Sequence, residues 1–164
     1  MMKKKLIIIP VNQFESHWSL MLVVRPDLLY NTFVADIDLS DDTQKTIIIG
    51  LDSLTTGISN VAHINILTWL NSLLNGNNQV QLVLDRFNLP ILVPSIPYQN
   101  NGWDCGVFCM KYVQCLYANT KWYLRTRNTA DLRENIEKVF SFDAQSVHDL
   151  RVLFRKKLHA YATA

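Results

Sequence analysis

The first half of the chain carries short apolar segments with the spacing of β-strands. Residues 6–11 form an apolar run, and the even-numbered residues from Trp18 to Val24 are apolar, so they would share one face of a strand over 17–24. The sequence TIIIGL at 46–51 predicts a third strand, which is followed by Asp52. Weaker strand candidates are the segments at 33–37, 80–84 and 91–93.

Apolar residues at helical spacing follow these strands. Ser59 and Asn60 can cap a helix over 61–74, and Gly76 lies just after its end. The apolar stripe of this helix consists of Ile64, Leu67, Leu70 and Leu74. Further helices are predicted over 105–117, 129–140 and 146–161, the last with the stripe Val147, Leu150, Leu153, Phe154 and Leu158. Since strands come first and helices last, the pattern favours an α+β fold in one domain over residues 1–164.

Composition narrows the function classes. The chain has 164 residues, of which 49% are hydrophobic and 18% charged, and this suits one domain with a proper core. Its formal net charge of +2 is too small for a general nucleic-acid-binding surface. No apolar run approaches the roughly 18 residues of a membrane span. The run at 6–9, which follows lysines at 3–5, is too short for a secretory signal. We therefore expect neither nucleic acid nor a membrane as a partner.

The three cysteines lie within 11 consecutive residues, at Cys105, Cys109 and Cys115. An odd, clustered set is a poor disulfide framework and fits a reducing compartment, so we expect an intracellular protein of the nucleus or cytoplasm. No histidine lies close to them in the sequence, which argues against a zinc site. We expect no metal and no organic cofactor.

Cys105 is the strongest candidate for chemistry. It follows the turn-rich sequence YQNNGWD at 98–104 and opens the helix predicted over 105–117. A helix N-terminus favours the thiolate, which is the nucleophilic form of cysteine. The alternative is that Cys105 is a small buried apolar residue, the usual state of a free cysteine. This alternative is stronger for Cys109 and Cys115, which lie inside the helix.

A cysteine nucleophile needs a histidine base and a third group that orients the base. His17 begins the strand over 17–24, which is a rigid support for an imidazole, although an edge histidine without a role is equally consistent with this position. The other histidines, His63, His148 and His159, are expected at the surface. Asp52 could orient His17 from the end of the strand over 46–51, and Asp36 is the rival acid.

Gln99 is the candidate oxyanion donor. It precedes Cys105 by six residues across a tight Asn-Asn-Gly turn. Its side-chain amide could donate to a developing oxyanion together with the backbone N–H of Cys105. Alternatively, the amide satisfies backbone groups of its own loop.

Three segments resemble, in residues and in their order along the chain, the motifs of the ubiquitin-like-protein-specific cysteine peptidases, the SUMO or sentrin proteases. The segment IPYQNNGWDCGVF at 96–108 looks like their nucleophile segment. IPVN at 9–12 followed by HWSL at 17–20 looks like their histidine segment, and LDSL at 51–54 looks like their aspartate segment. The resemblance extends from about residue 5 to the last helix.

The resemblance implies a papain-like fold, with a mixed or antiparallel central sheet flanked by helices and the nucleophile at the N-terminus of a central helix. It implies these roles: Cys105 as nucleophile, His17 as general base and then acid, Asp52 as orienting acid, Gln99 as oxyanion donor, Trp18 as wall of a narrow tunnel and Trp103 packed near the cleft. The implied enzyme is a thiol peptidase that cleaves after the Gly-Gly tail of SUMO or a related ubiquitin-like modifier. It would hydrolyse isopeptide bonds, process precursors, or both.

Three features depart from the family pattern. The loop over 12–17 is one residue longer than usual. Asp52 lies 35 positions after His17, and this long spacing fits an insertion at 25–45 and keeps Asp36 as the alternative acid. Only 16 residues precede His17, so we expect a domain that is short at its N-terminus. This shortness motivates a second hypothesis, a truncated and catalytically weak domain that binds the modifier. A third is an acetyltransferase with a related Cys-His-acid site, but the basic features of its inositol-phosphate site are not evident in the sequence.

Overall fold

The computed structural model describes residues 4–13, 15–33, 45–54, 56–75, 83–119, 121 and 129–163. Its elements, in chain order, are β1 (Leu6–Gln13), β2 (His17–Val24), the 3-10 helix η1 (Pro26–Phe33), β3 (Ile47–Leu51), α1 (Asn60–Asn75), β4 (Ile91–Leu92), α2 (Cys105–Ala118), α3 (Thr129–Val139) and α4 (Ala144–Ala162). The first three predicted strands and all four predicted helices are confirmed, and their ends move by at most two residues. Of the weaker strand candidates, the one at 91–93 corresponds to β4, and most of the one at 80–84 lies outside the described residues.

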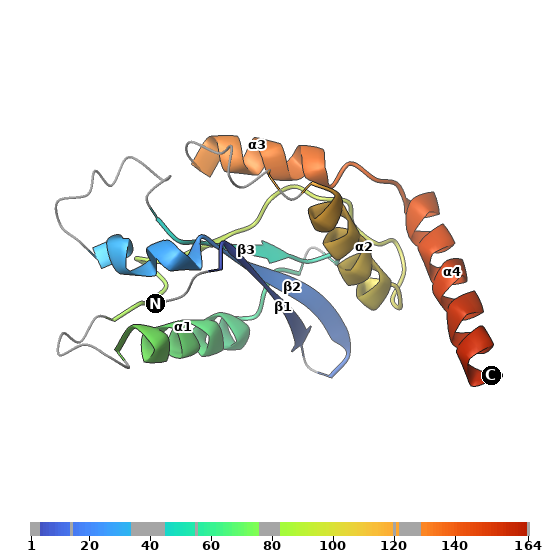
Figure 1. Cartoon of the computed structure of the whole chain (residues 1–164), viewed down its shortest axis with the longest axis horizontal. Coiled ribbons are helices and arrows are strands. Elements are labelled where there is room, and N and C mark those ends of the chain that lie inside the picture. Colours follow the sequence, from blue (N-terminus) through green and yellow to red (C-terminus); the bar gives the residue numbers. More distant parts are fainter. Residues whose placement is uncertain are drawn as a thin grey trace.

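The strands form one mixed sheet in the order β1-β2-β3-β4. β1 and β2 make an antiparallel hairpin that closes at the pair Gln13 and His17. β2 is also antiparallel to β3, whereas β3 and β4 are parallel, and the chain crosses between them through α1 (Figure 1). The predicted α+β architecture, with a mixed central sheet flanked by helices, is confirmed.

Helices cover both faces of the sheet (Figure 1), and the side chains of β2 alternate between the two cores. Met21 and Val23 pack in one core with Leu70 of α1. Leu20 and Leu22 point to the other face, where they pack in a second core with residues of α2, α3 and α4. Every residue of β2 from position 20 onward is at most 1% exposed. β2 is therefore the central support of the fold, and the residues at its start have a rigid base.

Two expectations for α1 are wrong. His63 is buried, and its Nε2 lies 3.1 Å from the carbonyl oxygen of Leu89. Burial lowers the pKa of His63, and the positive charge of Arg86 acts in the same direction. Ile64 is 48% exposed, because the buried face of α1 is turned by about one position from the predicted stripe. That face consists of His63, Ile66, Leu67 and Leu70.

The predicted apolar stripe of α4 is only half buried. Val147 and Leu150 are buried, but Leu153 and Leu158 are 47% and 67% exposed. Figure 1 shows the reason, because the C-terminal half of α4 extends away from the body of the molecule. The two histidines of this helix are exposed, as expected. Within the described ranges, no helix has the length and apolar character of a membrane span.

The segment at 25–45, predicted as an insertion, begins with helical structure. Residues 26–33 form the 3-10 helix η1, so Phe33 belongs to a helix and not to the weak strand predicted at 33–37. Lys5 lies 2.5 Å from Asp27 in this helix and ties it to the start of β1. The rival acid Asp36 lies outside the described residues.

Candidate active site

The start of β2 and the end of β3 place His17 beside Asp52. His17 is the first residue of β2, and Asp52 directly follows β3, in which Leu51 pairs with Leu20. Antiparallel pairing therefore brings together two residues that are 35 positions apart in the chain. Nε2 of His17 lies 2.6 Å from Oδ1 of Asp52, and both residues are buried.

Backbone and side-chain donors hold the Asp52 carboxylate. Oδ1 also accepts the backbone N–H of Leu54 at 3.0 Å, and Oδ2 accepts the Thr56 hydroxyl at 2.8 Å and the backbone N–H of Gly57 at 2.7 Å. Burial alone raises the pKa of Asp52, but the hydrogen bonds from Leu54, Thr56 and His17 outweigh it and hold the pKa below its usual value. The ionised carboxylate therefore accepts the Nε2–H of His17 and fixes the plane of the imidazole.

The second ring nitrogen of His17 is the reactive position of this pair. Nδ1 is buried and has no hydrogen-bond partner among the described residues, Sγ of Cys105 included. When Nε2–H donates to Asp52, a neutral imidazole carries its lone pair on Nδ1. Nδ1 is therefore the atom that can accept a proton.

Cys105 lies at the junction of α2 with β2. It is the first residue of α2 and is 7% exposed. Its neighbour Gly106 lies against Trp18, the neighbour of His17, since a Cβ on Gly106 would be 4.0 Å from Cδ1 of Trp18. The contact between Gly106 and Trp18 brings the N-terminus of α2 to the start of β2. The sequence predicted that Cys105 and His17 belong to one site, and the fold places each of them one residue from this contact.

The other two cysteines, Cys109 and Cys115, have raised pKa values. Burial raises the pKa of Cys109 to about 12, with the charges of Cys105 and Asp52 acting in the same direction. Burial also raises the pKa of Cys115. All three cysteines are free thiols. Among the described residues, no group of three His, Cys, Asp or Glu side chains is placed to hold a metal ion.

Gln99 is buried on the loop that leads to α2. Its backbone N–H donates to the carbonyl of Ser53 at 2.8 Å, and the Ser53 hydroxyl donates to its Oε1 at 2.6 Å. Its Nε2 donates to the carbonyl of Asn101 at 2.6 Å. One N–H of the amide is thus engaged in the loop, and the second N–H is the one that could serve an oxyanion. Ser53 is a neighbour of Asp52, so the acid and the amide are supported from the same turn.

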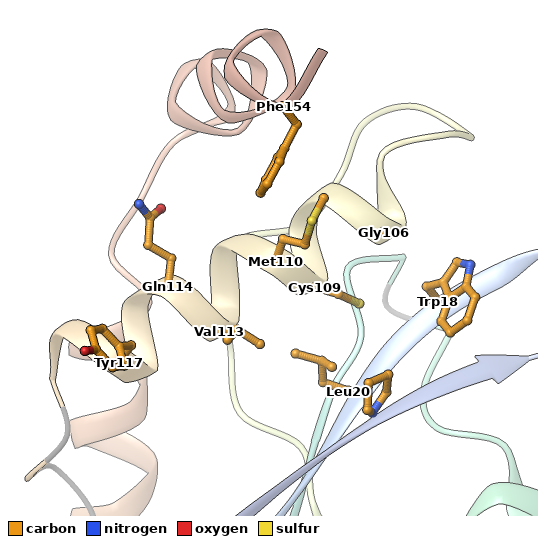
Figure 2. Close-up of a pocket in the computed structure, with 10 residues that line it drawn as sticks. Trp18, Leu20, Gly106, Cys109, Met110, Val113, Gln114, Tyr117 and Phe154 are labelled. Atoms are coloured by element: carbon orange, nitrogen blue, oxygen red, sulfur yellow. The ribbon is translucent and has the colours of Figure 1, made fainter. Parts of the chain in front are cut away.

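Trp18 and Trp103 lie in different surroundings. Trp18 lines an apolar hollow of about 710 Å³ between the β1–β2 hairpin, α2 and α4, together with Gly106, Met110 and Phe154 (Figure 2). Trp18 is 43% exposed, whereas Trp103 is 71% exposed and does not line this hollow. The structure therefore connects Trp18 to the start of α2 and leaves the Trp103 side chain largely in solvent.

Sequence reasoning missed the residues that brace the site, and Gln13 is the clearest example. Its Oε1 accepts the backbone N–H of Ser59 at 2.6 Å, and its Nε2 donates to the Ser19 hydroxyl at 3.0 Å and to the carbonyl of Gly57 at 3.5 Å. Gln13 is only 5% exposed, so its buried amide links the hairpin to the loop that binds Asp52. Its partner Ser59 is 46 positions away in the chain, so no local pattern marks Gln13 as important.

Comparisons with known proteins identify relatives of this chain. The family model described as the Ulp1 protease family, C-terminal catalytic domain, matches residues 1–148. The "Probable ubiquitin-like-specific protease 2B" of Arabidopsis thaliana is 28% identical over 123 residues, which are 72% of this chain and 13% of the relative. A crystal structure of a de-sumoylating protease is 22% identical and has a TM-score of 0.63, over 94% of this chain and 56% of that chain.

These comparisons differ in what they show. The chain spans a small part of the curated relative and about half of the solved one, and the structural likeness concerns the fold. The family model covers most of the sequence and includes His17, Asp52 and Cys105. The predicted family is therefore confirmed, and the chain belongs to the Ulp1 protease family, whose C-terminal catalytic domain it matches.

Proposed function

We propose that this chain is a cysteine peptidase that cleaves after the Gly-Gly tail of SUMO or a related ubiquitin-like modifier. The observation that carries the proposal is the 2.6 Å hydrogen bond between buried His17 and Asp52, which leaves Nδ1 of His17 without a described partner, while the adjacent Trp18 contacts Gly106 at the N-terminus of α2. The substrate class comes from family membership and from the relatives, which are described as a ubiquitin-like-specific protease and a de-sumoylating protease.

The first half of the proposed reaction forms a thioester. Nδ1 of His17 takes the proton of the Cys105 thiol, and Sγ attacks the carbonyl carbon of the last glycine of the tail. The backbone N–H of Cys105 and the second N–H of the Gln99 amide donate to the oxyanion. The protonated His17 then gives its proton to the departing amine, which leaves as the C–N bond breaks. Asp52 stabilises the imidazolium throughout, since its lowered pKa keeps the carboxylate ionised.

The second half regenerates the enzyme. His17 takes a proton from water, the resulting hydroxide attacks the thioester carbonyl, and the C–S bond breaks as the Cys105 thiolate leaves. The thiolate then takes the proton back from His17. The products are the modifier with a free carboxylate and either a lysine amine or a short precursor peptide. The same triad therefore supports both isopeptide hydrolysis and precursor processing.

The position of Trp18 supports a Gly-Gly tail as the substrate. Its indole lies against Gly106 next to Cys105, so a peptide that reaches the thiol has to pass close to an aromatic surface. Glycine has no side chain to collide with that surface. We propose Trp18 as a tail-binding residue and Trp103, which is exposed, as a contact for the body of the modifier. The three free thiols agree with the reducing interior of the cell, in the nucleus or the cytoplasm.

Covalent capture tests the proposal. The full chain is mixed with SUMO, ubiquitin and a neddylation modifier, each carrying an electrophile in place of its last glycine carboxylate. Mass spectrometry then detects a protein–modifier adduct. We expect an adduct with at least one modifier, none with Cys105→Ala, and an undiminished adduct with Cys109→Ala, because the thiol of Cys109 is buried and its pKa is raised to about 12.

The controls separate the two function hypotheses. An adduct that survives Cys105→Ala would overturn the assignment of the nucleophile. A folded protein that forms no adduct with any modifier would overturn the peptidase, and measurable binding of the unmodified modifier would then support the binding domain. The exposed apolar residues Met110 and Tyr117 support that second hypothesis, since they are available to a protein partner.

A further inference from the structure

Asp104, the residue before Cys105, does not cap its helix in the usual way. It is the N-cap residue of α2, yet its side chain accepts no hydrogen bond from the first turn. Aspartate at this position normally accepts a backbone N–H of the following turn, and the helix dipole favours its negative charge there. Asp143 behaves in this normal way at α4, where it accepts the backbone N–H of Ser146 at 2.9 Å. Some other interaction therefore holds the Asp104 carboxylate away from α2.

That interaction comes mainly from α4. Nε of Arg151 donates to Oδ1 of Asp104 at 2.6 Å, and Nη2 of the same guanidinium donates to Oδ1 and, at 3.2 Å, to the carbonyl of Trp103. Asn101 donates to Oδ2 at 2.7 Å, and its own Oδ1 accepts the backbone N–H of Asp104 at 3.0 Å. Arg151 is 47 positions from Asp104 in the chain, so α4 reaches across to hold the residue that precedes the thiol.

The position of this carboxylate matters for the chemistry at Cys105. A negative group over the first turn of α2 would occupy its N–H donors and would repel a thiolate and an oxyanion at the same place. The pair with Arg151 both removes the carboxylate from that turn and neutralises its charge. The backbone carbonyl of Asp104 meanwhile still accepts the N–H of Phe108 at 2.9 Å, so the helix begins normally.

We propose that Arg151 is a positioning residue for the nucleophile, an inference that rests on the proposed role of Cys105: it holds the Asp104 carboxylate off the N-terminus of α2 and so keeps that turn available for negative charge. Arg151 itself touches neither the thiol nor the substrate. Its effect passes through Asp104, and removal of both charges should restore what removal of Arg151 takes away.

Alkylation of Cys105 by iodoacetamide tests this without any modifier. The full chain is treated at about pH 7, and fragment mass spectrometry gives the rate constant at Cys105, separately from Cys109 and Cys115. For Arg151→Met we expect a rate about tenfold lower, because the carboxylate is released to cap the first turn beside the thiolate. The matched control Arg155→Met removes an exposed charge one turn later on α4 and should stay within about twofold of the wild type.

The rescue variant distinguishes positioning from packing. In Arg151→Met combined with Asp104→Asn, the freed side chain carries no charge, so the rate should return to within about threefold of the wild type. A residue that only supported the fold would leave the double variant as slow as Arg151→Met or slower. That result, or a wild-type rate for Arg151→Met, would overturn the inference.

Two further variants keep the test decisive if Arg151→Met does not fold. Asp104→Asn alone should be alkylated at least as fast as the wild type, since it removes the negative charge and leaves Arg151 in place; a clearly slower rate would overturn the inference. Arg151→Lys retains the charge but loses the paired donors and should fall between the wild type and Arg151→Met. If the alkylation rates follow this order but no modifier adduct forms, the proposed function is refuted and the positioning role of Arg151 stands.

Discussion

Replacing Asp52 by asparagine exchanges one acceptor oxygen for a donor in a carboxylate that accepts four hydrogen bonds. Oδ1 binds His17 Nε2 and the Leu54 N–H, and Oδ2 binds the Thr56 hydroxyl and the Gly57 N–H. The amide can turn either way, but its NH2 group then faces a backbone N–H in both orientations. At least one part-buried backbone N–H loses its acceptor, and in the orientation that turns the NH2 group toward His17 the imidazole loses its acceptor as well.

The cost follows from these contacts. Leaving a buried donor without an acceptor costs about 1–3 kcal/mol, and bonds to an ionised group are at the upper end. Because at least one backbone donor loses its acceptor and a neutral amide replaces the ionised group that binds all four donors, we expect Asp52→Asn to lower the free energy of unfolding by about 3 kcal/mol at neutral pH. The matched control is Asp85→Asn, because Asp85 also accepts two backbone N–H groups, both at its Oδ1, but is exposed. Asp85→Asn should lower the free energy of unfolding by less than about 1 kcal/mol.

Urea unfolding at two pH values provides the assay. Because the pKa of Asp52 is below its usual value, its ionised form stabilises the fold above the unfolded pKa near 3.8, and this contribution is lost as the pH falls through the lowered folded pKa. The wild type and Asp52→Asn should therefore differ fully in their free energy of unfolding at about pH 7, and this difference should become smaller below about pH 3. The reasoning would be refuted if this difference in free energy were equal at both pH values. It would also be refuted if Asp52→Asn lowered the free energy of unfolding no more than Asp85→Asn does.

Three further predictions concern buried positions of the fold. Gly50→Ala places a Cβ 2.6 Å from Cγ1 of Ile58, so the free energy of unfolding in urea should fall by about 2 kcal/mol. Gln13→Leu removes the acceptor of the Ser59 N–H and should cost about 2 kcal/mol; an unchanged melting temperature would contradict this. Because the pKa of His63 is lowered from 6.5, the unfolded chain binds the proton more readily, and stability should fall as the pH drops below that value. His63→Leu should lack this part of the pH dependence in urea titrations, and a dependence equal to that of the wild type would count against it.

The sequence predicted those parts of the fold that depend on local patterns. The apolar residues at every second position from Trp18 to Val24 predicted β2, and the residues between them, Met21 and Val23, are apolar as well because they face the other core. The stripe of α4 predicted a helix but not its exposure, since a stripe does not show whether another element covers it. For the same reason, His63 was misplaced: its burial depends on the carbonyl of Leu89, which is 26 positions away.

The candidate site was predictable to a similar extent. Motif order suggested His17, Asp52 and Cys105, and the structure joins the first two by a hydrogen bond. The choice between Asp52 and Asp36 could not be made from spacing, because the connection after β2 is long enough for either acid to reach His17. The bracing residues were not predictable at all. Arg151 is one of 16 Lys and Arg residues, and only the fold shows that it reaches Asp104.

The loop at 97–104 shows why such bracing matters for the proposed chemistry. It carries both the proposed oxyanion donor and the residue before the nucleophile, and it has no regular structure of its own. Three elements hold it instead: Ser53 after β3 binds Gln99, the hydroxyl of Tyr112 in α2 donates to the carbonyl of Pro97 at 2.6 Å, and Arg151 in α4 binds Asp104. The imidazole and its acid are fixed by the sheet, whereas the thiol and the amide are fixed by contacts from separate elements. The relative position of base and nucleophile therefore depends on tertiary contacts of the loop, and replacing the residues that hold it from outside, Ser53, Tyr112 or Arg151, should lower reactivity before it unfolds the sheet.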